Sequence, residues 1–201
     1  MFICVAVGLL PIIIATQSRN SYLACLFLLG GAICAKAFKI KKVPNWVLVC
    51  IVWLPIIVFV FYMFVIVENM SFWENIFSID NIDKGLGTRK NIWQAVLDDF
   101  WHCFLFGDYK KYYNGQMHNS LLTVFCRFGA PATIAVCVLL YKALKKIQDN
   151  TDFYSVLSLA AVLFTGCFEA SVFIGVAGLY IMLLLIPAGS AAEYNYNLKK
   201  E

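Results

Sequence analysis

A polar stretch between residues 85 and 129 concentrates the side chains that could do chemistry. Arg89 and Lys90 follow two glycines, Lys110 and Lys111 come later, and His118 stands just before a new apolar run. Guanidinium and ammonium groups bind anions, and an imidazole with an ordinary pKa near 6.5 can transfer a proton or contact an anion. This combination predicts a site that holds an anionic group beside a histidine.

Arg89 lies at the start of a predicted helix. Apolar residues repeat at helical spacing after it: Ile92, Trp93, Val96, Leu97, Phe100 and Trp101. The pattern predicts an amphipathic helix along a membrane surface, with Thr88 as its N-cap. A cation in the first turn opposes the positive end of the helix macrodipole, and an anion bound there would resolve the conflict. Alternatively, Arg89 and Lys90 are surface charges that reach lipid phosphates.

His118 is one of two histidines, the other being His102 on the predicted surface helix. It precedes a new apolar segment, where Asn119 and Ser120 can cap the helix or orient the imidazole. From this place it could transfer a proton or contact a phosphate. Lone histidines are more often structural, so both alternatives remain open.

The surrounding elements are expected to be apolar helices. Of 201 residues, 62% are hydrophobic and 14% charged, against roughly 25% charged in soluble domains, and the mean hydropathy is +0.77. We therefore expect an all-α integral membrane protein. A net charge of +4 without a basic stripe argues against nucleic acid and leaves membrane lipid as a partner. The eight cysteines lack CxxC spacing, so we expect packing residues and no metal or cofactor.

We expect about six transmembrane helices and one long extracytoplasmic loop that carries the surface helix. Three helices fall in 1–67, the loop is 68–118, three helices fall in 119–190, and 191–201 is a cytoplasmic tail. The run 43–67 is the strongest span, with a proline inside it. One span covers 120–141 and stops at Lys142, and 153–186 forms two spans that turn near Glu169. The run 1–15 fits the end of a spanning helix better than a signal peptide.

Charge sets the orientation of these spans. Lysines cluster at 36–42, at 142–146 and in the tail at 199–200, and loops rich in lysine and arginine stay cytoplasmic. Alternation from a cytoplasmic 36–42 places all three clusters on one side. The long loop and Arg19 then lie on the outer side.

The order of short motifs from residue 16 to 129 resembles the O-antigen ligase and Wzy-type polysaccharide polymerase family. The motifs are Thr16-x-Ser18-Arg19, Gly87-x-Arg89-x-x-x-Trp93, Leu105-Phe106-Gly107, His118-Asn119-Ser120-Leu121-Leu122 and Phe128-Gly129. Phe104 and Tyr109 stand where the family commonly has proline and glycine. Family members are longer and carry further N-terminal spans, so the chain resembles the C-terminal half.

The resemblance implies a multi-pass glycosyltransferase of the bacterial plasma (inner) membrane. Such an enzyme polymerises or ligates polysaccharide repeat units from an undecaprenyl-diphosphate-linked donor on the outer face. Arg19 and Arg89 would bind the diphosphate and stabilise it as it leaves. His118 would position or deprotonate an acceptor hydroxyl, or contact the diphosphate, which makes His118 and Arg89 the candidate catalytic residues. The implied partners are a lipid-linked oligosaccharide donor, a glycan acceptor, and a missing N-terminal half or other polysaccharide-assembly proteins.

The alternative from another class is a non-enzymatic membrane protein, either a transporter fragment or a truncated or split subunit without activity of its own. Transport favours ionisable residues deep in several spans. Here the charges collect at one face, and only Arg127 lies deep in a predicted span. We expect Arg127 to pair with Glu169, with a glycan-binding cavity as the alternative.

Overall fold

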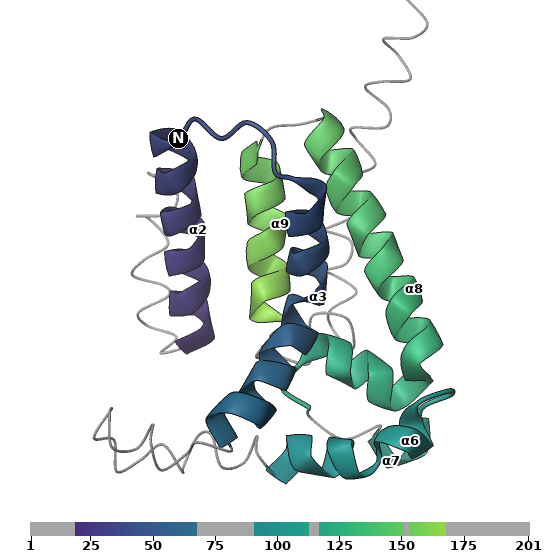
Figure 1. The fold of residues 1–201 in the computed structure, drawn as a ribbon. Coiled ribbons are helices and arrows are strands. Elements are labelled where there is room, and N and C mark those ends of the chain that lie inside the picture. Colours follow the sequence, from purple (N-terminus) through teal and green to yellow (C-terminus); the bar gives the residue numbers. More distant parts are fainter. Residues whose placement is uncertain (1–18, 68–90, 113–116, 151–152, 168–201) are drawn as a thin grey trace, which may run out of the picture.

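The computed structural model describes residues 19–67, 91–112, 117–150 and 153–167 (Figure 1). Within these ranges the chain is almost entirely helical and has no strand. The all-α class is therefore confirmed for the described residues. The first apolar run, the helix start at Thr88, the turn near Glu169 and the polar tail lie outside them.

Four helices form the body of the molecule. They are α2 (Arg19–Ala37), α3 (Asn45–Phe61), α8 (Ser120–Asn150) and α9 (Phe153–Thr165). Helix α2 packs on α9, and α3 packs on both α8 and α9 (Figure 1). The shared core consists of Leu48, Val52, Leu121, Cys137, Leu144, Ile147, Val156, Leu159 and Leu163. Burial of these apolar side chains holds α3, α8 and α9 together.

Helix α3 continues through Pro55, which is buried inside it. Proline removes a backbone donor from the ladder, so packing against neighbours must compensate. The helix then passes into a six-residue π-helix, η1 (Tyr62–Val67). Tyr62 and Met63 at its start are buried in a second core at the end of the bundle. The other members of this core are Phe59, Trp93, Val96, Cys103, Tyr112, Met117, Leu122, Phe125 and Cys126.

Helix α8 does not stop at Lys142 as the charge pattern predicts. It continues to Asn150, because Lys142, Lys145 and Lys146 all lie on its exposed face while Leu144 and Ile147 are buried in the core. Spacings of three and four residues put the lysines on one stripe. Lysine is also a good helix former, so the charges do not end the helix.

Helix α8 is broken at Gly129, whose backbone is not helical (φ 82°, ψ 179°). The chain turns sharply there in Figure 1. Pro131 falls in the first turn of the second half, where a missing N–H costs little. The break therefore lies two residues before the proline.

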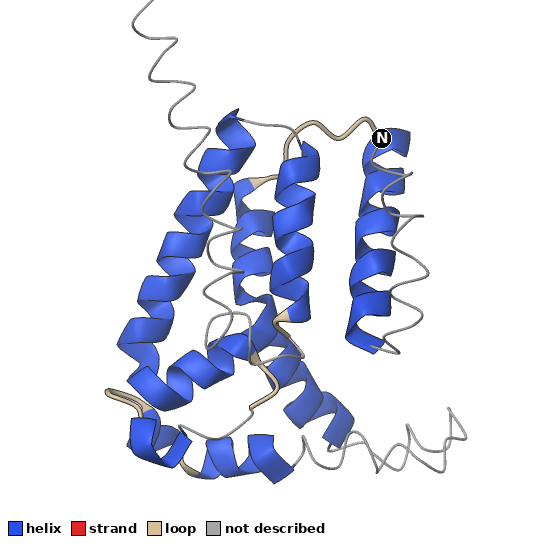
Figure 2. Cartoon of the chain, turned by 180° about the vertical axis from the view of Figure 1, so that it is seen from behind, coloured by secondary structure: helices blue, strands red, loops and turns tan. Residues whose placement is uncertain are grey.

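Residues 91–112, called the crosswise segment below, lie across one end of the bundle (Figures 1 and 2). They form a helix at 91–98, then α6 (Phe100–Cys103) and α7 (Tyr109–Tyr112). Trp93 and Val96 are buried, as the apolar stripe predicts. Trp101, the last residue of the stripe, is 82% exposed and belongs to neither core of the described residues, so its expected place at a membrane surface stays a prediction.

Two of the described helical segments are long and apolar enough to cross a membrane, judged by length and composition alone. They are Asn45–Val65 and Ser120–Asp149, and α2 and α9 contribute shorter apolar segments. This is fewer than the six spans expected for the whole chain.

The described lysines of both clusters lie at the end opposite residues 91–112. The segment that links α2 to α3 meets the C-terminal part of α8 there, where Val43 bonds Gln148 and Lys42 lies 3.9 Å from Asp149. The two clusters thus share one end of the bundle, as the predicted orientation requires.

Candidate functional site

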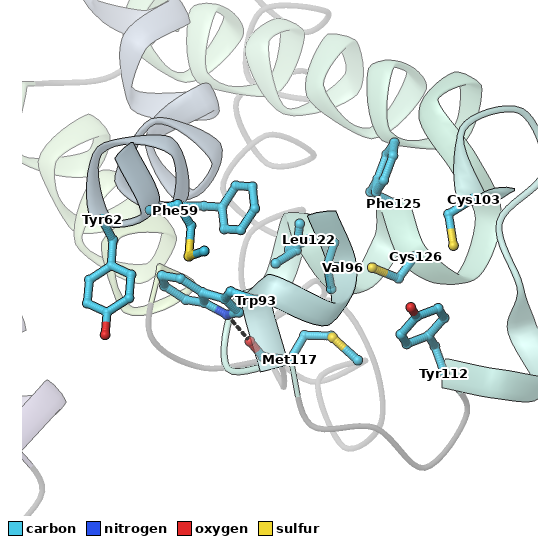
Figure 3. Packing of buried hydrophobic residues seen from close by; sticks show 11 residues of the cluster. Phe59, Tyr62, Trp93, Val96, Cys103, Tyr112, Met117, Leu122, Phe125 and Cys126 are labelled. Atoms are coloured by element: carbon cyan, nitrogen blue, oxygen red, sulfur yellow. Dashed lines mark hydrogen bonds between the residues drawn. The ribbon is translucent and has the colours of Figure 1, made fainter. Parts of the chain in front are cut away.

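His118 lies in the segment that enters α8, and hydrogen bonds fix the residues on both sides of it. On the N-terminal side, the Trp93 indole Nε1 donates to the Met117 carbonyl at 2.7 Å (Figure 3). Trp93 is 1% exposed and packs edge-on against Phe59 and Tyr62. The helix at 91–98 and the end of α3 therefore position the backbone immediately before His118.

Asn119 follows His118 and is fully buried. Its Oδ1 accepts the backbone N–H of Leu122 at 3.0 Å, which caps the start of α8. Its Nδ2 donates to the carbonyl of Pro55 at 2.7 Å. One amide side chain therefore both starts α8 and ties that start to the middle of α3.

Ser120 provides the third anchor. Its backbone N–H and its hydroxyl both donate to the carbonyl of Gly166, at 2.8 and 3.0 Å. A Cβ at Gly166 would collide with the Ser120 hydroxyl, so the close approach needs glycine. The end of α9 is thereby fixed against the start of α8.

His118 itself is half-buried and has a left-handed backbone, with φ of 48°. Non-glycine residues rarely adopt this conformation, and such strain persists only where the surroundings impose it. Here hydrogen bonds that join Met117, Asn119 and Ser120 to three other parts of the chain impose it. The backbone that carries the imidazole is thus held in place, at the end of the bundle where α8 begins.

The two glycine motifs lie against each other. Gly107 (φ 68°) approaches the backbone of Arg127 and Phe128, and Gly129 approaches the carbonyl of Leu105, so closely that a Cβ at either glycine would overlap backbone atoms. The break at Gly129 removes the helical bond from the Ala130 N–H to the Cys126 carbonyl. Backbone groups of residues 104–108 form hydrogen bonds that take the place of this helical bond.

The replacement uses two hydrogen bonds of 2.7 Å. The Ala130 N–H donates to the Phe104 carbonyl, and the Asp108 N–H donates to the Cys126 carbonyl. Both orphaned backbone groups of the broken helix are therefore satisfied. Residues 104–108, called the bridging loop below, join the crosswise segment to α8 at this point.

A polar cluster links α6 and α7 beside this loop. Asp99 accepts hydrogen bonds from the Lys111 ammonium and, at 2.6 Å, from the Tyr112 hydroxyl. These two donors hold the pKa of Asp99 below its usual value, while burial and Asp99 raise the pKa of Tyr112. A carboxylate held by two donors is a poor proton acceptor, so the geometry gives Asp99 a structural role.

Asp108 has a similar role at the start of α7. Its carboxylate accepts the backbone N–H of Lys111 at 3.0 Å and lies 3.5 Å from the Nε2 of His102. The Lys111 N–H and His102 both lower the pKa of Asp108. His102 is therefore paired within the crosswise segment and exposed to solvent.

Arg127 is 8% exposed, and its Nε donates to the carbonyl of Tyr112 at 3.0 Å. It joins α8 to the end of α7. The expected partner, Glu169, lies outside the described residues, so that pairing stays a prediction.

Of the three predicted site residues, His118 is the one whose side chain the structure describes. Arg19 begins α2, at the end of the bundle where the crosswise segment lies (Figure 1), and nothing further is described of its side chain. Arg89 lies just before the described helix at 91–98. The convergence of two guanidinium groups and an imidazole therefore stays a prediction.

Sequence reasoning missed the anchoring roles of Trp93, Pro55 and Gly166. The indole N–H of a buried tryptophan needs an acceptor, and this requirement was the available signal for Trp93. Within the described ranges, no group of three or more histidine, cysteine, aspartate or glutamate side chains is arranged so that it could hold a metal ion. In comparisons with known proteins, no family model, curated protein or solved structure matches the chain.

Proposed function

We propose that the chain is a multi-pass membrane glycosyltransferase, built from about six spans, in the bacterial plasma membrane. It transfers polysaccharide repeat units from an undecaprenyl-diphosphate-linked donor at the outer face, as a polymerase or a ligase. Two described helices with the length and composition of membrane spans support the membrane placement. The motif order given above supports the reaction class.

The observation that carries the proposal is the fixed backbone of His118. His118 has a left-handed backbone and lies between two buried hydrogen bonds, the one from Trp93 to Met117 and the Asn119 cap of α8. A backbone fixed in this way suits a side chain that must keep one orientation. Its neighbour Met117 is bonded to Trp93 of the crosswise segment, and α2 begins at the same end of the bundle (Figure 1). Both predicted arginines belong to these elements or directly precede them.

In the proposed reaction an acceptor hydroxyl attacks the anomeric carbon of the donor, and the bond to the lipid diphosphate breaks. The imidazole of His118 takes the hydroxyl proton or orients the hydroxyl. Arg19 and Arg89 stabilise the negative charge that develops on the departing diphosphate. An aimed imidazole and fixed guanidinium groups favour such a reaction because neither has to reorganise as charge develops.

The test replaces His118 and Arg89 in the native host and measures the length distribution of surface polysaccharide. His118→Ala and Arg89→Ala should abolish long chains at normal protein level. Arg89→Lys should also lose activity, since lysine keeps the charge but not the bidentate fork. The matched control is His102→Ala, because His102 is exposed and paired with Asp108 away from the fixed backbone. Normal chains in both the His118 and Arg89 variants would refute the proposal.

One observation favours a non-enzymatic membrane protein as the second candidate. Lys111, His102 and Arg127 all contact groups of this chain, as expected of a loop whose cations only stabilise the fold. Under this alternative, His118→Ala would lower protein level and polysaccharide together. Under the enzyme proposal, polysaccharide alone would fall.

A further inference from the structure

The end of the bundle opposite His118 carries a dense basic surface. Seven exposed lysines form it, here called the lysine surface: Lys36, Lys39, Lys41, Lys42, Lys142, Lys145 and Lys146. Asp149, which lies 3.9 Å from Lys42, is the one described carboxylate at this end. The surface therefore carries a large positive charge and suits an anionic partner.

A side chain in the interior brings the two halves of this surface together. Gln148 is 8% exposed and forms two hydrogen bonds of 2.9 Å with the backbone of Val43, donating to its carbonyl and accepting from its N–H. Val43 follows the first lysine group, and Gln148 follows the second by two residues. The paired bonds thus hold the linking segment against α8 and combine two groups, distant in sequence, into one surface.

An apolar groove lies between α3 and α8, next to the lysine surface. Its volume is 190 Å³, and it is lined by Val49, Val52, Trp53, Ile134, Cys137, Val138 and Tyr141. Tyr141 immediately precedes Lys142, and Val49 lies about one turn into α3. The groove therefore begins within a turn or two of the basic groups.

Exposed apolar side chains stand beside the same surface. Phe38 and Trp46, in and just after the linking segment, are 75% and 69% exposed. Aromatic residues next to lysines are typical of the level at which lipid headgroups meet hydrocarbon. A nucleic acid or an acidic protein would match the charges but would leave the apolar groove unused.

We propose that this end of the molecule binds an anionic phospholipid. The lipid phosphate lies among the lysines of the lysine surface, and one acyl chain lies in the groove between α3 and α8. The inference rests on the membrane placement given under the proposed function and is independent of glycosyl transfer. It assigns a lipid site to the face opposite the proposed reaction.

The experiment uses the full chain reconstituted in phosphatidylcholine nanodiscs, with phosphatidylglycerol added in increasing proportion. The thermal midpoint of unfolding should rise with phosphatidylglycerol, and raising the salt from 0.1 M towards 1 M should weaken the rise, because the screening length falls from about 10 to about 3 Å. Lys142→Gln with Lys145→Gln should raise the proportion needed for half the effect by roughly fivefold per lysine. Lys110→Gln, at the opposite end, removes one charge and should have no such effect, whereas Lys142→Gln alone should raise the proportion roughly fivefold.

Two further variants test the geometry. Gln148→Met keeps the size and charge of the side chain but removes both bonds to Val43, so it should weaken the phosphatidylglycerol response with all lysines present. Val138→Phe should fill the groove and do the same, whereas Leu139→Phe, at a 66% exposed position outside the groove, should not.

The outcomes separate this inference from the proposed function. A chain that inserts but responds equally to both lipids would overturn the lipid site. A lysine effect that neither Gln148→Met nor Val138→Phe reproduces would overturn the groove as the seat of the acyl chain. A chain that fails to insert into either disc would instead refute the membrane placement.

Discussion

Replacing Gly107 with alanine should detach the bridging loop from the break in α8. The added methyl group would overlap the backbone of Arg127 and Phe128, and alanine would have to adopt a φ of 68°. Neither neighbour can yield, because both are backbone atoms of α8 close to the break at Gly129. The loop must therefore move away.

The cost follows from the contacts that the loop makes. A left-handed backbone costs alanine about 1–2 kcal/mol. Forcing the added methyl group against fixed backbone atoms costs about 1–3 kcal/mol more in the attached state. The bonds from Asp108 to Cys126 and from Ala130 to Phe104 are broken in the detached state of either variant, so they do not enter the difference. The sum is centred on about 3 kcal/mol, which corresponds to a rise of about a hundredfold in the population of the detached state at about 1.4 kcal/mol per tenfold.

Two cysteines can report this detachment directly. Cys103 and Cys126 are 1% and 0% exposed, so in a background that keeps only these two, maleimide labelling requires the loop to open. Gly107→Ala should raise the labelling rate by about two orders of magnitude at the predicted cost. Gly30→Ala is the matched control, because nothing lies within 4 Å of its added Cβ and alanine favours a helix. Equal labelling of the two variants would refute the reasoning.

Three other changes test the anchors and the polar cluster. Asn119→Ala should lower the free energy of unfolding by about 2–3 kcal/mol in denaturant titration, because it removes the cap of α8 and the donor to Pro55. His118→Gly should leave stability unchanged or raise it by up to about 1 kcal/mol, since glycine accepts the left-handed backbone, and a loss as large as that of Asn119→Ala would contradict the assigned strain. The folded pKa of Asp99 lies below its unfolded value near 3.9, so its contribution is present above that pH and lost as pH falls through the folded pKa. Asp99→Asn should therefore make the thermal midpoint fall less steeply below pH about 4, and an unchanged acid slope would count against the cluster.

Apolar patterning was enough to predict most of the described elements. The run at 43–67 contains α3 and η1, and the stripe that includes Trp93 and Val96 faces the core. These predictions succeed because burial depends on periodicity, which the sequence shows directly. The end of α8 was missed because lysine is compatible with both a helix and a loop, and only packing of Leu144 and Ile147 decides between them.

The candidate site was less accessible to sequence reasoning. The motifs could be read, but not the reason for their glycines, because the contact between Gly107 and the break at Gly129 joins residues 22 positions apart. Likewise, the cap at Asn119 follows from its residue type, whereas its bond to Pro55 spans 64 positions. Local rules predict capping and turn chemistry, and tertiary contacts of this kind require the fold.

The bridging loop means that α8 is completed by chain from outside itself. Residues 104–108 precede Cys126 and Ala130 in the chain. The Phe104 carbonyl and the Asp108 N–H therefore gain these partners only when α8 is present. The bend of α8 and the position of the crosswise segment thus depend on the same two hydrogen bonds. An insertion or deletion within these five residues would therefore change the bend of α8 as well as the path of the loop. Substitution of their exposed side chains would leave the bend unchanged.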